Sequence, residues 1–498
     1  MSLFVKKPLS TLMAEASDSE KGLKKTLTAG SLIALGIGAI IGAGLFVRTA
    51  SAAAQNAGPS VTFGFIVAAI GCALAGLCYA ELSSSIPIAG SAYTYSYATM
   101  GELIAWIIGW DLILEYAVGA ATVGIAWSEY LNNLLVNVFG WKPIPYEWSH
   151  SPFESFTDPV THLVSHGMIN IPALIIVALL SLLLIRGTQE SAFVNGIIVI
   201  TKVAIVVLFI VIGWGFINPA NHTPYIPPAT TYIDHQGLPH NFGGFWGIIG
   251  AAGVVFFAFI GFDAVSTAAQ EAKNPKRDMP IGILGSLVIC TILYILFAHV
   301  LTGVATTEDF RTSGKEASVA FAIQKYMTGY GWLAKSVTVA ILAGFSSVIL
   351  VMLLGQSRVF YSMSKDGLLP KVFSELHPKY KTPYKANLFI LIIVGLFAAF
   401  IPGDIVGDMT SIGTLFAFIL VCAAVIVLRK TNPELPRQFK TPGVPVIPIL
   451  GIIVCTLMIL GLGWPNWLRL IVWLLIGFVI YFSYSKKNSV LRKASGDK

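Results

Sequence analysis

Apolar stretches of roughly helical length alternate with short polar segments along almost the whole chain. A helix needs about 20 apolar residues to cross the ~30 Å hydrocarbon core of a bilayer, and twelve stretches come near that length. We expect membrane-spanning helices at residues 27–47, 61–84, 103–136, 169–186, 191–217, 245–268, 281–304, 332–362, 386–401, 405–428, 446–463 and 467–484. The pattern therefore predicts an all-α polytopic membrane protein with 12 transmembrane helices.

The first stretch, residues 27–47, carries no charge but has three closely spaced glycines, Gly38, Gly42 and Gly44. Glycine weakens a helix by about 1 kcal/mol relative to alanine. In hydrocarbon an unpaired backbone group costs several kcal/mol, so a helix break is tolerated only where it is buried in protein or lines a cavity. Close packing between helices explains the glycines equally well, since Gly38 and Gly42 have the small-xxx-small spacing. This stretch alone leaves both interpretations open.

A second glycine-interrupted stretch, residues 245–262, is followed at once by Asp263. It lies five apolar stretches after the first, as a repeat of five helices requires. Interrupted segments at matching places in two halves of a chain are a good indicator of a transporter's central site. The pair therefore favours a break with a function over simple packing.

Four motifs carry a resemblance to a known family: GAGLF at residues 42–46, AELSSSIPIAGSAYTYSY at 80–97, GFDAVSTAAQE at 261–271 and KNPKRDMP at 273–280. The chain resembles the amino acid, polyamine and organocation transporter superfamily from Lys24 to Tyr484, most closely its cationic amino acid transporter family and the bacterial relatives of that family. The resemblance implies a core of two inverted five-helix repeats (5+5), with helices 1 and 6 broken, plus two C-terminal helices. Helices 1, 2, 6 and 7 would rock against a scaffold to give alternating access.

This resemblance also implies a division of the chain. The expected units are an N-terminal tail (1–26), a first repeat (27–217), an extracellular loop (218–244), a second repeat (245–428), a cytoplasmic loop (429–445), two last helices (446–484) and a C-terminal tail (485–498).

The resemblance further implies where an L-amino acid binds. Freed amides at the start of a half-helix favour an anion, and freed carbonyls at the end of one favour a cation. The amides of Gly42, Ala43 and Gly44 would hold the carboxylate, with Ile40 as a further substrate contact. The carbonyls of Phe257, Ala258 and Ile260 would take the ammonium group. Phe257 matches the family's aromatic gate, although packing among its neighbouring phenylalanines is an alternative.

Lys202 is the ionisable residue deepest within an apolar stretch. Eleven residues at about 1.5 Å each place it ~16 Å from the start of its helix, a long way for snorkelling to the interface, which is the alternative. By resemblance, its ammonium occupies the place of the cation in sodium-coupled relatives, and Ser346 and Ser347 match the hydroxyls of that cation site. Because the charge of a lysine changes with protonation, the proton would be the coupling ion.

Two acidic residues lie near the expected site, Glu115 in the third stretch and Asp263 after the second break. Ionisable groups within a bilayer are costly and are functional candidates by default. Each of the two could bind a substrate cation, relay a proton or satisfy freed backbone amides. Asp111 precedes Glu115 by one helical turn and would share its face. Glu81 and Arg358, near the expected cytoplasmic ends, fit either a salt-bridged gate or simple solvation.

Composition narrows the class of protein. Hydrophobic residues make up 55% of the chain and charged residues 11%, with a mean hydropathy of +0.77, far from the charged share of soluble domains. All five cysteines lie in apolar stretches without metal-ligand spacing, so we expect reduced packing residues and no metal site. Six of the eight histidines lie in two polar loops, where we expect them to be solvated, and a metal site there is the alternative. Motifs typical of enzymes, metal centres or phosphate loops do not occur, and we expect no cofactor and no nucleic-acid partner.

The basic residues indicate the orientation. If the N-terminus is cytoplasmic, 24 lysines and arginines lie on that side and seven on the other. Positive charge favours the cytoplasmic side, so we expect both termini there, in the cell membrane. The polar segments 137–168 and 218–244 would then be outer surface loops without a role in the chemistry, and residues 305–331 would hold a short helix.

These observations predict a secondary active permease that imports L-amino acids by proton symport. Substrate exchange, and specificity for arginine and lysine, are the alternatives. Apolar residues near the expected pocket, Val348, Ile349 and Met352, favour neutral substrates. An enzyme or a channel is a different class; saturable accumulation against a gradient separates a carrier from both. The lipid bilayer is an expected partner, whereas a small accessory membrane subunit is not readable from the sequence.

Overall fold

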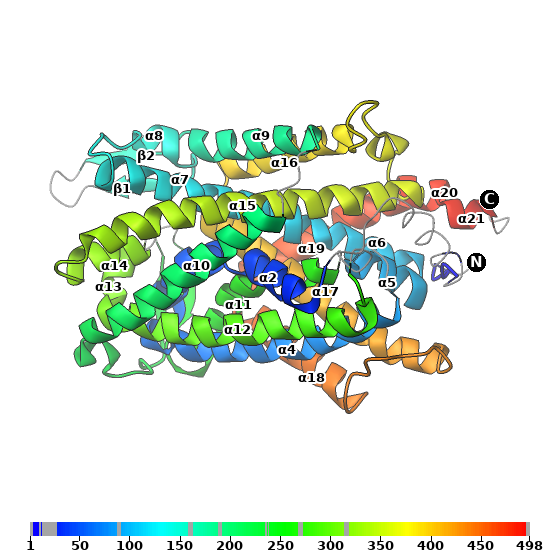
Figure 1. The fold of residues 1–498 in the computed structure, drawn as a ribbon, viewed down its shortest axis with the longest axis horizontal. Coiled ribbons are helices and arrows are strands. Elements are labelled where there is room, and N and C mark those ends of the chain that lie inside the picture. The colour runs from blue at the N-terminus through cyan, green and yellow to red at the C-terminus, as the bar shows by residue number, and fades with distance from the viewer. Residues whose placement is uncertain are drawn as a thin grey trace.

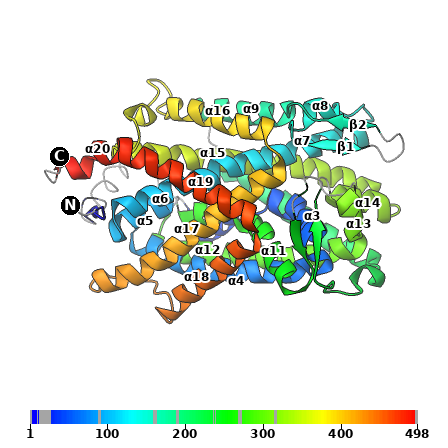
Figure 2. The ribbon, with the colours of Figure 1, turned by 180° about the vertical axis from the view of Figure 1, so that it is seen from behind.

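The protein is a bundle of long helices that run mostly along one axis (Figure 1). The computed structural model describes residues 3–8, 11, 27–86, 91–157, 163–187, 192–234, 237, 239–266, 272–312 and 318–494. The two marked chain ends lie together at one end of the bundle, hereafter the terminal end. At the other end, hereafter the hairpin end, lie the hairpin of β1 (Ser155–Thr157) and β2 (Val164–His166) and the helices α13 (Thr307–Thr312) and α14 (Ser318–Tyr326) (Figures 1 and 2).

Helices account for most of the described residues. In the first half they are α2 (Ala29–Ile40), η1 (Gly44–Arg48), α3 (Thr49–Ala52), η2 (Ala53–Ala57), α4 (Val61–Ser85), α5 (Ser91–Thr99), α6 (Glu102–Ile113), η4 (Leu114–Val118), α7 (Gly119–Asn137), α8 (Tyr146–Ser149), α9 (Ile171–Ile185) and α10 (Ala192–Gly213). In the second half they are η6 (Pro219–His222), α11 (Gly244–Val255), η7 (Phe256–Phe259), α12 (Pro275–Val304), α13 (Thr307–Thr312), α14 (Ser318–Tyr326), α15 (Gly331–Lys365), α16 (Tyr384–Phe400), α17 (Gly403–Thr431), α18 (Val446–Gly461), α19 (Trp464–Ile480), η10 (Tyr481–Ser485), α20 (Lys486–Asn488) and α21 (Val490–Ala494).

Eight helical segments within the described residues are long and apolar enough to cross a membrane, and α2, α9, α16 and α18 are shorter apolar helices. The protein is therefore an all-α, multi-pass membrane protein, as expected. Burial differs strongly among the segments. In the most apolar window of segment Gly244–Ser266, 89% of the residues are buried, against 22% for segment Trp464–Ala494. The segment with the second break thus lies at the centre of the bundle, and the last helices lie outside it.

Close packing joins several of these helices. Helix α12 packs along both α4 and α2, and α15 packs along α7. Helices α9 and α16 lie side by side along one edge, in both views (Figures 1 and 2). The five cysteines are all buried and free, which confirms their interpretation as packing residues.

The first break is present: α2 ends at Ile40, and the chain bends at Ile41 and Gly42 before η1 begins. The expected end of this span at residue 47 is wrong, because the helix continues through η1, α3 and η2 to Ala57. Arg48, directly after the expected end, is buried and ion-paired within this continued helix.

The polar segments hold more structure than expected. Strands β1 (Ser155–Thr157) and β2 (Val164–His166) form one antiparallel hairpin, and β3 (Thr230–Ile233) and β4 (Pro239–Phe242) form another. The single short helix expected within residues 305–331 is replaced by two, α13 and α14. These elements cover the hairpin end, so that end of the central helices is not simply open.

Candidate functional site

The two broken helices meet backbone to backbone. A Cβ atom added at Gly44 would overlap the Cα and nitrogen atoms of Ala258 in η7. On the other side of the second break, Gly261 has a φ of +110°, which L side chains rarely adopt, and lies against the carbonyl of Ala39. Glycine is therefore required at both positions, and the two breaks form one continuous feature at the centre of the bundle.

The first break leaves amides available. The interruption after Ile40 starts a new helical segment, whose N-terminus carries partial positive charge. None of the hydrogen bonds that link the described elements uses the amides of Gly42, Ala43 or Gly44 as donors. All three residues are buried. Their amides can bind an anion without the help of a charged side chain.

The second break presents carbonyl groups. Phe257, Ala258 and Ile260 are all at most 3% exposed. The carbonyl of Phe257 accepts a hydrogen bond from the amide of Ile260 at 3.3 Å. A carbonyl oxygen has two lone pairs, so an acceptor site remains there for a cation.

Tyr294 of α12 joins the two breaks. Its hydroxyl lies 2.9 Å from the carbonyl oxygen of Ile40 and 2.9 Å from that of Ala258. The side chain is fully buried, with its ring against Phe65 and Phe259. Sequence reasoning missed this residue, because a lone tyrosine in an apolar helix resembles any other packing aromatic.

Lys202 of α10 lies next to the first break. Its Nζ donates a hydrogen bond to the carbonyl oxygen of Gly38 at 2.9 Å, and the residue is only 2% exposed. Its aliphatic stem passes over Gly344 of α15, where an added Cβ would lie 2.6 Å from Lys202 Cε. The lysine therefore stays within the bundle and does not snorkel to an interface.

The two serines expected beside Lys202 lie on the same part of α15, shortly after Gly344. Ser346 Oγ donates to the carbonyl of Leu342 within its own helix at 2.9 Å. Ser347 is 1% exposed. The geometry thus brings Lys202, the α2 break and this segment of α15 together.

A separate acidic group lies between helix α6–α7 and the second break. Tyr116 donates a hydrogen bond from its hydroxyl to Asp263 Oδ2 at 2.7 Å, and the carboxyl group of Glu115 lies beside that of Asp263. Glu115 and Tyr116 belong to η4, a π-helical turn, and such turns occur often at functional sites. Asp111, one turn earlier, is also fully buried. The structure thus brings Glu115 and Asp263 together.

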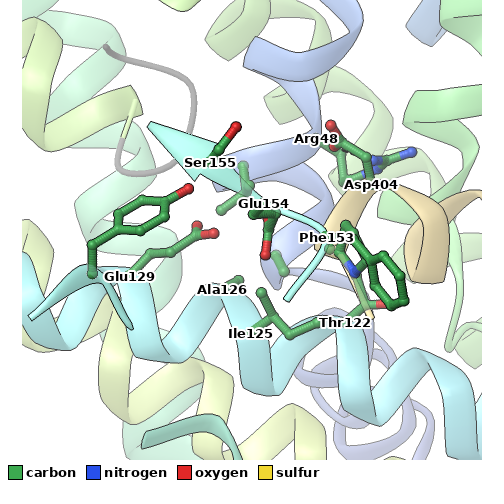
Figure 3. Close-up of a pocket in the computed structure, with 14 residues that line it drawn as sticks. Arg48, Thr122, Ile125, Ala126, Glu129, Phe153, Glu154, Ser155 and Asp404 are labelled. Carbon is green, nitrogen blue, oxygen red and sulfur yellow. Dashed lines mark hydrogen bonds and ion pairs between the residues drawn. The ribbon is translucent and has the colours of Figure 1, made fainter. Parts of the chain in front are cut away.

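At the hairpin end, an ion-pair cluster joins the first broken helix to α17. Arg48 Nη1 lies 2.9 Å from Asp404 Oδ1, and its Nη2 pairs with Asp408. Ser51 and Gln55 donate further hydrogen bonds to Asp404. Sequence reasoning missed this cluster, of which Figure 3 shows Arg48 and Asp404, because the first span was expected to end at residue 47, directly before Arg48.

At the terminal end, ion pairs hold the helices and tails together. Glu81 of α4 accepts a bidentate pair from Arg429, at 2.9 and 2.7 Å, which favours a salt-bridged role over simple solvation. Glu102, at the start of α6, is paired with Arg492 of α21 at 2.6 Å. Lys7 pairs with Asp366 at 2.7 Å. This end is therefore closed by side chains from both tails.

Among the described residues, no group of three or more His, Cys, Asp or Glu side chains is placed to hold a metal ion. The central site consists of backbone groups, one tyrosine and one lysine. It can bind a small molecule with one anionic and one cationic group without any cofactor.

Comparison with known proteins gives a consistent picture. The family model described as amino acid permease matches residues 27–485. The chain is 45% identical to the branched-chain amino acid permease BcaP of Bacillus subtilis, over 99% of both chains. It is 40% identical to the methylthioribose transporter of the same organism, over 99% of this chain and 100% of the relative. It is also 36% identical to the chloroplastic cationic amino acid transporter 9 of Arabidopsis thaliana, over 90% of this chain and 75% of the relative. These relatives are transporters and not enzymes.

Proposed function

The chain belongs to the amino acid permease family, and we propose that it imports L-amino acids across the cell membrane by proton symport and alternating access. The observation that carries this proposal is the direct contact between Gly44 and Ala258, which brings the free amides of one break against the carbonyls of the other. An α-amino acid zwitterion carries its ammonium and carboxylate groups on the same carbon atom and matches this arrangement.

We assign the substrate's two charged groups to the two breaks. The amides of Gly42, Ala43 and Gly44 bind the carboxylate. The carbonyls of Ile40, Phe257, Ala258 and Ile260 bind the ammonium group. Tyr294 contacts two of these carbonyls, and because each oxygen has a second lone pair, the ammonium group adds to that contact or replaces it. Phe257, buried next to both breaks, covers the substrate from the hairpin end.

The proposed layout is twelve spans, ten of them in two inverted repeats at residues 27–217 and 245–428, with the tails at 1–26 and 485–498. The eight long and four shorter apolar helices support it. The two marked chain ends lie at the same end of the bundle, as an even number of spans requires. The excess of basic residues supports a cytoplasmic terminal end.

Lys202 is the proposed proton carrier. When charged, it donates to the Gly38 carbonyl and ties α10 to the last turns of α2. When neutral, it makes a weaker contact there, because hydrogen bonds from ionised donors are roughly twice as strong. Loading and release of the proton thereby bias the position of α2, the half-helix on the terminal side of the break. Glu115 and Asp263 form the proposed relay, and Ser346 and Ser347 the polar surface beside the lysine.

Neutral, branched-chain amino acids are the proposed substrates. Val348 of α15 is the side chain nearest to Gly42, where an added Cβ would lie 3.3 Å from a Val348 methyl group. An apolar wall at that position suits an apolar substrate side chain and gives no partner to a guanidinium. The similarity to BcaP supports the same class.

The test is uptake into proteoliposomes under an imposed inward proton gradient, with radiolabelled leucine, arginine and methylthioribose supplied separately. We expect saturable leucine accumulation above the external concentration, and weaker uptake of the other two. Accumulation of arginine or methylthioribose alone would contradict the substrate assignment. Exchange of internal for external leucine without net accumulation would replace symport by antiport, and flux without saturation would indicate a channel.

A further inference from the structure

A short turn at the terminal end places exposed basic residues beside two apolar helices. It comprises residues 377–382, in the connection between α15 and α16, and lies against the end of α9 (Figure 1). Neither the central site nor the ion pairs described at the terminal end include these residues. The turn therefore has no role in the function proposed so far.

Hydrogen bonds hold the turn in one conformation. The amide of His377 donates to the carbonyl of Thr382 at 2.7 Å, and the amide of Lys381 donates to the carbonyl of His377 at 2.9 Å. His377 Nδ1 accepts from the amides of Lys379 and Tyr380, both at 3.2 Å. Lys381 has a φ of +57°, the only positive φ of a non-glycine residue in the described part of the chain. Such a conformation is costly for an L residue, persists only where the surroundings fix it, and occurs often at functional sites.

The turn is fixed to the C-terminal end of α9. Thr382 Oγ1 donates a hydrogen bond to the carbonyl of Ile185 at 2.7 Å. A Cβ atom added at Gly187 would lie 3.5 Å from the carbonyl oxygen of Tyr380 and 3.9 Å from its Cβ atom. Arg186 lies between these two contact points, so its side chain and those of the residues next to Tyr380 share one region of the surface.

Three basic residues gather in this region: Arg186, Lys379 and Lys381. All three are exposed, and none of them is ion-paired with another residue that the structure describes. Glu375, the nearest acidic residue along the same connection, is itself paired with Lys385. The positive charge of the three residues is therefore not neutralised by the described part of the chain, and it attracts an anion.

An apolar surface continues from these charges along the same edge of the bundle, where α9 and α16 lie side by side (Figures 1 and 2). Exposed apolar side chains follow the turn on both helices: Leu179 and Leu182 on α9, and Leu388, Phe389 and Ile392 on α16. Basic residues next to apolar, exposed helix faces match the headgroup and the acyl chains of an anionic lipid. A soluble anion would use the charges alone.

We propose that this turn and the adjacent faces of α9 and α16 bind an anionic phospholipid of the cytoplasmic leaflet. The lipid phosphate lies among Arg186, Lys379 and Lys381, the ring of Tyr380 lies at the level of the headgroups, and the acyl chains pack along α9 and α16. The inference rests on the orientation given in the proposed function, which places the terminal end on the cytoplasmic side. The site is separate from the two breaks, so lipid binds whether or not substrate is present.

The test uses the purified full-length chain in nanodiscs of phosphatidylcholine that contain a small share of a lipid with a photoreactive diazirine in one acyl chain. This probe is either phosphatidylglycerol, which is anionic, or phosphatidylcholine with the same chains. Mass spectrometry after illumination measures cross-linking to α9 and to α16. Leucine uptake is measured separately, so a failure of the proposed transport and a failure of the lipid site are distinguishable.

A variant and a matched control each remove three positive charges from the same end of the protein. The variant combines Arg186→Gln, Lys379→Gln and Lys381→Gln. The control combines Lys430→Gln, Lys486→Gln and Lys487→Gln, three exposed residues that belong neither to the turn nor to α9 or α16. A thermal unfolding curve for each chain identifies a folding defect, and the comparison of the two probes on the native chain does not depend on any variant.

We expect phosphatidylglycerol to label α9 and α16 of the native chain about tenfold more than phosphatidylcholine does. The variant should lose most of this difference, because each basic residue near a membrane surface contributes about fivefold in affinity for anionic lipid, and the control should keep it. Equal labelling of the native chain by the two probes would overturn the site. An equal loss in the variant and in the control would also overturn it, because diffuse attraction by the total charge would then be sufficient.

Discussion

The ammonium group of Lys202 lies 2.9 Å from the carbonyl oxygen of Gly38, two residues before α2 ends. The contact joins a titratable side chain to the broken helix by one hydrogen bond. A change in the protonation of Lys202 therefore alters a hydrogen bond of the broken helix directly, without any intervening residue. The hydroxyl of Tyr294 continues the connection, since it contacts the carbonyls of Ile40 and Ala258.

Gly44→Ala should abolish substrate binding at the central site. The added methyl group would overlap the backbone of Ala258, so one of the two breaks must shift away from the other. A backbone shift of this kind separates the groups that bind the carboxylate from those that bind the ammonium group. Leucine uptake in proteoliposomes checks this.

Gly196→Ala is the matched control for that variant. Gly196 lies in α10 with open space where a Cβ would be placed. Its replacement should leave uptake unchanged, because alanine is at least as good a helix former. Equal uptake by Gly44→Ala and Gly196→Ala would refute the contact between the breaks.

Tyr294→Phe should lower both stability and leucine affinity. The variant keeps the ring but leaves two buried carbonyl oxygens without their donor, at a cost of about 1–3 kcal/mol. Tyr225→Phe removes a hydroxyl bonded to Thr62 at the hairpin end and is the control. Thermal unfolding should show a loss in both variants, whereas leucine binding should fall only in Tyr294→Phe. A normal affinity in Tyr294→Phe would limit Tyr294 to packing.

Arg492→Met should destabilise the terminal end. Glu102 is fully buried and would lose its cation, which costs up to about 3–5 kcal/mol for a broken buried pair. The hydroxyls of Tyr97 and Tyr481, each 3.0 Å from Glu102, remain and reduce the loss. The unfolding temperature measures it, and Lys493→Met, next along α21, is the control. Equal unfolding temperatures for the two variants would show that the tail does not hold the helices.

Acidification should weaken the hairpin end through His222. Burial, together with the adjacent ring of His299, lowers the pKa of His222 below its usual 6.5. An unfolded histidine keeps the usual pKa, so as the pH falls through 6.5 the unfolded state binds more protons than the folded one. The stabilisation is therefore complete above pH 6.5 and declines below it. Thr302 and Tyr225 complete the surroundings of the ring.

Unfolding temperatures at pH 7.5 and 5.5 test this for the native chain, for His222→Gln and for His166→Gln. His166 lies exposed in β2 and serves as the control. The loss on acidification should be smaller in His222→Gln than in the other two chains. The same loss in all three chains would show that His222 does not cause the pH dependence.

The sequence predicted much of this architecture because its signals are local. Glycines at residues 42 and 44, and a lysine deep in an apolar stretch, each violate a rule for ordinary membrane helices. Both breaks and the burial of Lys202 follow from such violations. A buried tyrosine is ordinary in a membrane helix, so the sequence does not single out Tyr294. Its contact with both breaks depends on how α12 packs against them.

The hairpin end was predicted least well, for a physical reason. Arg48 lies directly after the expected end of the first span, and nothing near it in sequence neutralises it. Its partners, Asp404 and Asp408, lie more than 350 residues later in the chain. Glu154 likewise joins Arg48 and Glu129 only after the loop folds back. Residues that pair over such a distance in sequence produce no local pattern from which the contact could be predicted.

The measurement that tests the central claim most directly is leucine accumulation driven by a proton gradient, in the native chain and in Lys202→Met. Lys335→Met, which removes an exposed lysine from α15, is the matched control. The account predicts that the native chain and the control concentrate leucine, and that Lys202→Met exchanges leucine but no longer concentrates it. Accumulation by Lys202→Met with the same dependence on the gradient as the native chain would contradict the claim that this lysine carries the proton.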